Sequence, residues 1–75
     1  MGVELPEHLR EKTYAFPEYS YGANRVTLVL NDGRRIEQVF LAWGTEIVKI
    51  KNKKIEKSDE LKFRIEDIAE VISEI

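Results

Sequence analysis

The clearest pattern in the chain is a central pair of apolar, β-branched runs separated by a turn. Residues 25–30 (RVTLVL) form the first run, and residues 34–43 (RRIEQVFLAW) form the second. Between them stand Asn31, Asp32 and Gly33, and glycine can adopt the positive φ of a tight turn without steric cost. Because branched residues favour strands and these turn residues separate them, the pattern predicts a β-hairpin.

The second run has a break in its alternation. Val39, Leu41 and Trp43 fall on one face of a regular strand. Ile36 falls on the opposite face, beside polar residues. A β-bulge near residues 37–38 would bring Ile36 onto the same face as the later apolar residues. Such a bulge also bends a strand strongly, as closing a small barrel requires.

A third strand is predicted directly after this hairpin. Residues 44–45 (GT) form a second tight turn, because glycine again allows a positive φ. Residues 46–51 (EIVKIK) then form the strand. Their alternation places Val48 and Ile50 on one face and Ile47 on the other.

A fourth strand is predicted after a polar segment. Residues 52–60 contain a turn and a loop of charged residues. In residues 61–65 (LKFRI), apolar and basic side chains alternate strictly, as on a strand with one face toward the core. We therefore expect Leu61, Phe63 and Ile65 to face the core.

The C-terminal residues 66–75 (EDIAEVISEI) are compatible with two structures. The apolar residues have the i, i+3, i+4, i+7 spacing of an amphipathic helix: Ile68, Val71, Ile72 and Ile75. Alternatively, one helical turn over residues 66–69 precedes a short closing strand from Glu70. The pattern leaves both open, and the second is favoured because four strands alone leave an open sheet edge.

The N-terminal part is predicted as an extension that packs on the β core. Residues 3–12 (VELPEHLREK) form a short helical turn with Pro6 at its first position, and Leu5 and Leu9 are spaced for one apolar contact. Residues 13–24 (TYAFPEYSYGAN) form an extended aromatic segment. Both pieces require the core for their stability.

Seventy-five residues provide one hydrophobic core, so we expect a single domain over residues 1–75, with an extension at 1–24 and a β core at 25–75. The fold class is mainly β: a small, strongly bent antiparallel sheet or barrel of about four or five strands, with a short C-terminal helical turn or helix. The runs "VTLVLNDGRRI" and "LKFRIEDI" resemble SH3-like and Sm-like barrels in strand order and turn placement. This resemblance implies a fold and no function.

Composition excludes most catalytic and metal chemistry. The chain has no cysteine, so disulfides and thiolate metal sites are excluded. His8 is the single histidine, and it lies in the N-terminal extension, where its position relative to a nucleophile is poorly held. Acidic pairs at residues 59–60 and 66–67 lie in polar stretches that do not desolvate them. We therefore expect a protein that is not an enzyme and has no metal or cofactor.

The lengths of the apolar runs and the net charge indicate where the protein is located and which partners it attracts. No apolar run approaches the roughly 20 residues that span a membrane, and residues 1–12 lack the apolar centre of a signal peptide. We therefore expect a cytoplasmic protein without membrane contact. The formal net charge of −2 gives nucleic acid little overall attraction.

A lysine cluster is the first candidate binding surface. Residues 49–57 carry five lysines and one acid, whereas residues 58–75 carry two cations and six acids. The candidate anion-binding or nucleic-acid patch consists of Lys49, Lys51, Lys53 and Lys54. The favoured interpretation of these lysines is a solvated edge that resists unwanted strand pairing, and the alternative is a phosphate-binding patch.

An aromatic group is the second candidate surface. Its members are Tyr14, Phe16, Tyr19, Tyr21 and Trp43. Exposed aromatic side chains anchor protein interfaces or stack on nucleic-acid bases, and buried ones would close the open end of the barrel. We expect a small binding or structural module for a protein partner or for a second copy of itself, as a homodimer. The alternative is a nucleic-acid-binding barrel that uses the lysine face and aromatic stacking.

Overall fold

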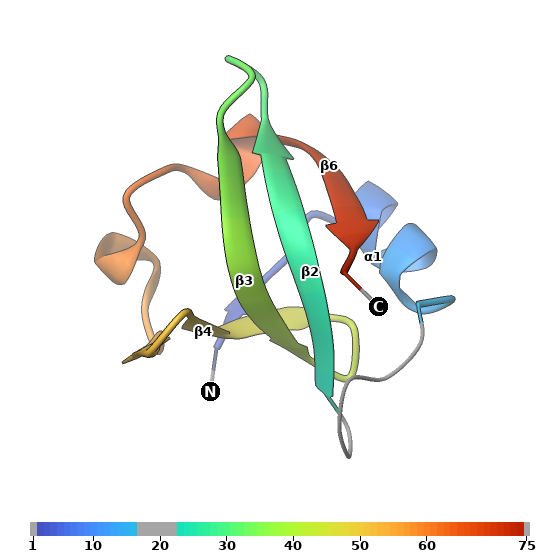
Figure 1. Ribbon diagram of the computed structural model, residues 1–75, viewed down its shortest axis with the longest axis horizontal. Coiled ribbons are helices and arrows are strands. Elements are labelled where there is room, and N and C mark those ends of the chain that lie inside the picture. The colour runs from blue at the N-terminus through green and yellow to red at the C-terminus, as the bar shows by residue number, and fades with distance from the viewer. Residues whose placement is uncertain (1, 17–22, 75) are drawn as a thin grey trace.

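The computed structural model describes residues 2–16 and 23–74. Their main element is a strongly curled antiparallel sheet (Figure 1). Its strands are β1 (Val3–Glu4), β2 (Ala23–Leu30), β3 (Arg35–Ala42), β4 (Glu46–Ile50), β5 (Lys53–Lys54) and β6 (Ile68–Ser73). The strand order is β1-β4-β3-β2-β6, and β5 pairs with β4. The fold is therefore mainly β, and the sheet bends into a half-barrel, which confirms the predicted fold class.

The predicted central hairpin is formed by β2 and β3. The Leu30 amide donates to the Arg34 carbonyl at 2.8 Å, and the Gly33 amide donates to the Leu30 carbonyl at 2.9 Å. Gly33 has a φ of +92°, the left-handed conformation that closes a three-residue hairpin loop. The positive φ predicted for Gly33 is therefore confirmed.

The predicted bulge in β3 is also present. The pairing of β2 with β3 runs from Val26 opposite Val39 to Leu28 opposite Ile36. Two steps along β2 therefore match three along β3, so one extra residue is inserted at residues 37–38. This insertion turns Ile36 toward the buried core, against which it packs.

A second bulge, in β4, overturns the predicted faces of that strand. Phe40 of β3 pairs with Lys49, but the next residue of β3, Leu41, pairs with Ile47. Val48 is therefore the extra residue. As a result Ile47 is fully buried and Ile50 also packs against the core, whereas the regular alternation placed them on opposite faces.

The C-terminal segment takes the turn-plus-strand structure. A 3-10 turn, η2 (Ile65–Asp67), leads directly into β6, so the helical alternative is wrong. The pairing of β6 with β2 skips one residue at Ala69, and this third bulge buries both Ile68 and Val71. Ile72 lies on the other face of β6 and is 37% exposed.

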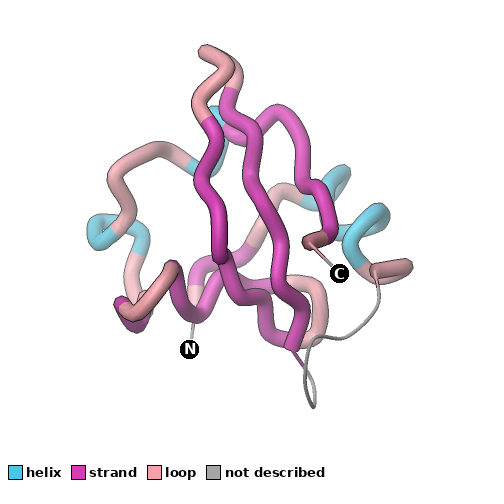
Figure 2. Tube along the Cα trace, viewed as in Figure 1, coloured by secondary structure: helices cyan, strands magenta, loops and turns pink. Residues whose placement is uncertain are grey.

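The predicted fourth strand over residues 61–65 does not form. Among the described residues this segment has no strand partner: Figure 2 shows residues 61–64 as loop between η1 (Ser58–Glu60) and η2, and Ile65 is the first residue of η2. The Glu60 carboxylate accepts hydrogen bonds from the Glu56 and Lys57 amides at 2.8 and 2.9 Å. This compact turn sets the direction of the chain before Leu61. Residues 61–65 then pass no described strand closely enough to pair with it.

The predicted N-terminal helical turn is present, but the residues before and after it differ from the prediction. Helix α1 (Glu7–Thr13) begins after Pro6 and contributes Leu9 to the core. Before it, β1 pairs with β4, which the sequence pattern did not indicate. The predicted extended segment is wrong at residues 13–16, which form the helix end and a turn, while residues 17–22 lie outside the described residues.

The core lies on the inner side of the curled sheet and is covered by α1, which stands next to β6 (Figure 1). A 2.9 Å ion pair between Lys12 and Glu70 joins these two elements. The buried apolar residues are Leu5, Leu9, Val26, Leu28, Leu30, Val39, Leu41, Ile47, Ile55, Ile68 and Val71. Within the described ranges, no helix has the length and apolar character needed to cross a membrane.

Candidate functional site

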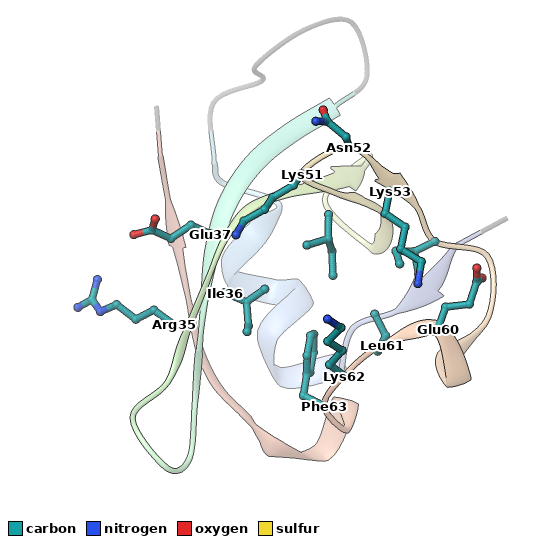
Figure 3. A pocket seen from close by; sticks show the side chains of 12 residues that line it. Arg35, Ile36, Glu37, Lys51, Asn52, Lys53, Glu60, Leu61, Lys62 and Phe63 are labelled. Carbon is teal, nitrogen blue, oxygen red and sulfur yellow. The ribbon is translucent and has the colours of Figure 1, made fainter.

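A cleft opens where the half-barrel fails to close, between the start of β3 and residues 61–63 (Figure 3). Its volume is about 550 Å³. Small-molecule and peptide sites commonly fall between roughly 300 and 1,000 Å³. We refer to this opening, bounded by residues 35–37, 50–53, 55 and 60–63, as the cleft.

The floor of the cleft is apolar. Its five members are Ile36, Ile50, Ile55, Leu61 and Phe63. In Figure 3 the side chains of Ile36, Leu61 and Phe63 converge on the cavity. Two of the bulges create this floor, because they turn Ile36 and Ile50 inward from strands whose regular alternation would direct them elsewhere.

The rim of the cleft carries an excess of positive charge. Its charged residues are Arg35, Lys51, Lys53 and Lys62 against Glu37 and Glu60. Hydrogen bonds from two backbone amides, assisted by the charge of Lys53, lower the pKa of Glu60. Its carboxylate is thus ionised at neutral pH and is engaged in the turn that it caps. The cationic side chains therefore make the rim positively charged.

One wall of the cleft is an edge of β3 that has no second strand beside it among the described residues. β3 pairs with β4 only from Val39 onward, so Arg35 and Ile36 pair with β2 alone and Glu37 lies in the bulge. The hydrogen bond from Leu30 to Arg34 makes these two a hydrogen-bonded pair. Hydrogen-bonded and non-hydrogen-bonded pairs alternate along an antiparallel ladder, so the next residue, Arg35, directs its amide and carbonyl away from β2. These groups point to the cleft side of β3.

The predicted lysine patch divides between two places. Lys51 and Lys53 line the cleft. Lys49 instead lies over the ring of Phe40, with its ammonium 5.4 Å from the ring centre, and Lys54 pairs across the strand with Lys49. β4 ends at Ile50, and Lys51 enters a turn with a φ of +55°. Lys49 and Lys51 therefore do not share one strand face.

The predicted aromatic group divides as well. Tyr14 and Trp43 are each 66% exposed, whereas Phe16 packs against the core. Tyr19 and Tyr21 lie outside the described residues. The alternation placed Trp43 on the same strand face as Val39 and Leu41, but β3 ends at Ala42 and Trp43 lies in the next turn. That shared face is therefore wrong for Trp43.

Tyr14 and Trp43 belong to the same end of the sheet. Trp43 has a φ of +55° and Gly44 one of +75°, the two positive values that a tight hairpin turn requires. The Thr13 hydroxyl donates to the Gly44 carbonyl and holds the end of α1 on this turn. This aromatic end lies at the opposite end of β3 from the cleft.

Comparisons of the chain with protein-family models, with curated proteins and with solved structures find no match. The resemblance to SH3-like and Sm-like barrels in strand order and turn placement therefore stays a prediction. The candidate site rests on the geometry of the cleft alone.

The floor of the cleft was missed by reasoning from the sequence. Ile36 was placed on one face with the later apolar residues of its strand, and Leu61 and Phe63 were placed on the apolar face of a separate fourth strand. The available signals were the register break at Ile36 and the strict alternation of residues 61–65. Neither reveals that the two segments face each other across an opening, because pairing is decided by the path of the whole chain.

Proposed function

We propose that the protein is a non-enzymatic binding module that holds an extended segment of a partner protein in the cleft. The observation that carries this proposal is the apolar floor directly beside the free edge of β3. Apolar pockets supply binding energy by removing side chains of the partner from water, and a free strand edge supplies backbone hydrogen bonds. The cleft offers both in one place.

The distribution of charged and aromatic side chains favours a protein segment over single-stranded nucleic acid. Proteins that bind single strands place stacking aromatics along the same groove as their cations. Here the exposed Tyr14 and Trp43 lie at one end of β3, whereas Lys51 and Lys53 line the cleft at the other. The net charge of −2 also weakens any general attraction for phosphates.

A selection experiment tests the proposal with defined probes. Random linear peptides displayed on phage are selected on the immobilised protein, and the enriched peptides are synthesised with a fluorophore for polarisation titrations. Phe63→Ala, which removes part of the floor, is expected to weaken binding by about tenfold or more. Leu61→Ala, from the same wall, should act in the same direction.

Trp43→Ala is the matched control, because it removes an exposed aromatic side chain at the far end of β3. It should leave the affinity unchanged, and thermal melts establish that each variant is folded. Enriched peptides that depend on Trp43 and ignore Phe63 would overturn the cleft as the binding site. Light scattering on the free protein and a titration with single-stranded RNA separate the two alternatives. A stable dimer or tight, salt-sensitive RNA binding would also count against the proposal.

A further inference from the structure

We propose that the segment bound in the cleft is an acidic, apolar peptide that adds to β3 as an extra strand. This inference rests on the proposed function and specifies the chemistry of its ligand. Three features of the cleft carry it: the free backbone edge, the alternation of its side chains, and the charge of its rim.

The backbone of both walls is suited to strand pairing. Arg35 directs its amide and carbonyl toward the cleft, as derived above from the β2–β3 register. On the other wall, Leu61 has φ −81° and ψ 147°, and Arg64, which directly follows that wall, has φ −95° and ψ 144°; both conformations are extended. A peptide between the walls would thus lie beside extended backbone on each side. The three residues 35–37, which lack a second neighbouring strand among the described residues, span about 10 Å, enough for roughly three residues of an added strand.

Side chains in an added strand alternate between the floor and the rim. Figure 3 shows this alternation on β3 itself, where Ile36 points into the cavity and Arg35 and Glu37 point away from it. Every second side chain of the bound strand would therefore meet Ile36, Leu61 and Phe63. The side chains between them would face the rim. The ligand is thus expected to alternate apolar residues with residues that suit the rim.

The charge of the rim determines those intervening residues. Arg35 and Glu37 point away from the cavity, which leaves Lys51, Lys53 and Lys62 against Glu60, and the Glu60 carboxylate is held by backbone amides. Aspartate or glutamate side chains of a ligand would meet the ammonium groups of Lys53 and Lys62. Lysine or arginine at the same positions would be repelled. Charge complementarity therefore specifies an acidic segment.

The occupant is a partner and not a second copy of this chain. Within the described residues, each strand that combines apolar and acidic side chains already pairs with a neighbouring strand; β6, which contains Glu70 and Val71, is one of them. β6 is already paired with β2 over most of its length. Between the two walls of a neighbour's cleft, β6 could lie as a single strand only by leaving β2, which would expose the buried side chain of Val71.

Two synthetic peptides of about eight residues serve as probes. In the first, valine alternates with glutamate, and in the second, valine alternates with lysine. Each carries a fluorophore and is titrated against the wild-type protein at low salt. The glutamate peptide is expected to bind, and the lysine peptide is expected to bind about tenfold more weakly or not at all.

Two charge-reversal variants test whether the lysines of the rim recognise the charge of the peptide. Lys53→Glu with Lys62→Glu reverses the rim, and Lys49→Glu with Lys54→Glu makes the same change in net charge outside the cleft. The rim variant should lose the glutamate peptide and gain the lysine peptide. The control variant should keep the wild-type preference. A gain of binding cannot result from unfolding, so the swap remains informative if the rim variant is less stable.

N-methylation of the glutamate peptide tests strand addition. Methyl groups on alternate backbone amides block hydrogen bonding along one edge of a strand only. One of the two alternating patterns is expected to abolish binding. If both methylated peptides bind like the parent, the ligand does not join β3 and the inference is overturned.

The failure of this inference is distinguishable from the failure of the proposed function. If selected peptides depend on Phe63 but carry no acidic residues, the cleft binds peptides and only the ligand class is wrong. If no peptide depends on Phe63, both proposals are wrong. Equal binding of the two probes by wild-type protein would overturn the acidic ligand alone.

Discussion

Glu74 is expected to be the most important charged residue for the stability of this fold. Its carboxylate accepts hydrogen bonds from the Thr27 hydroxyl at 2.7 Å and from the Gln38 amide at 2.9 Å. It also forms a 3.0 Å ion pair with Arg25. One side chain near the C-terminus therefore ties β2 to the bulge of β3. Gln38, the bulged residue, has a φ of +58° and requires such support.

The magnitude follows from the number and exposure of these contacts. A hydrogen bond to a charged group is worth about 1.5–3 kcal/mol. The side chain of Glu74 is 19% exposed, so solvent screens part of this interaction. We expect Glu74→Ala to lower the free energy of unfolding by about 2 kcal/mol, and Glu74→Gln by about 1 kcal/mol. For a domain of this size, 2 kcal/mol lowers Tm by about 8–16 °C.

The pH dependence of this contribution has a definite sign. Burial raises the pKa of Glu74, but the hydrogen bonds from Gln38 and Thr27 and the charge of Arg25 outweigh it and lower the pKa below its ordinary 4.5. A lowered folded-state pKa gives stability that is fully present above the ordinary value. It is lost as the pH falls through the folded-state pKa. The wild-type protein and Glu74→Gln should therefore converge in acid.

Urea denaturation at neutral pH and at about pH 3 measures both effects. Glu70→Gln is the matched control, because Glu70 stands on the same strand and forms only an exposed pair with Lys12. It should change the free energy of unfolding by less than about 1 kcal/mol. The reasoning is refuted if Glu74→Gln costs no more than this control, or if its cost is the same at both pH values.

Two further predictions concern glycines. Gly44 and Gly33 both have positive φ, but a Cβ at Gly44 would lie 3.2 Å from the Thr13 carbonyl oxygen, whereas Gly33 faces open space. Thermal melts should therefore show Gly44→Ala to be more destabilising than Gly33→Ala, which costs about 1–2 kcal/mol from backbone strain alone; equal costs would contradict the crowding. A Cβ at Gly2 would meet the Ile47 carbonyl oxygen at 2.1 Å, so Gly2→Ala should detach β1 from β4. Hydrogen exchange would show this as faster exchange of β1 and β4 amides, and unchanged exchange would contradict it.

Features that are visible within one stretch of sequence were predictable. The turn at Gly33 and the two flanking runs identify the hairpin without knowledge of any other element. The bulge at residues 37–38 was equally visible, because Ile36 conflicts with the alternation that follows it in the same strand. Of the candidate site, the lysines Lys51 and Lys53 were identified from their density in the sequence.

Features that depend on pairing with a distant strand were not predictable. Ile47, Val48 and Ile50 are all apolar, so their pattern is compatible with either face and does not reveal the bulge in β4. The bulge at Ala69 is hidden in the same way. It allows Ile68 and Val71, which have the three-residue spacing of a helix, to face the same side of a strand. Trp43 continues the alternation of β3 but follows the point at which the strand ends.

The cleft lies where the sequence pattern and the structure disagree. Residues 61–65 have the alternation of a strand, yet they pair with no strand among the described residues. Residues 35–37 belong to β3, and in the part of the chain that the structure describes they have no second neighbouring strand. Local pattern and global structure usually agree in a folded protein, and their conflicts are concentrated at functional sites. Two segments that are each suited to a further strand, and that face each other across an apolar floor, are most simply explained by a third strand from a partner.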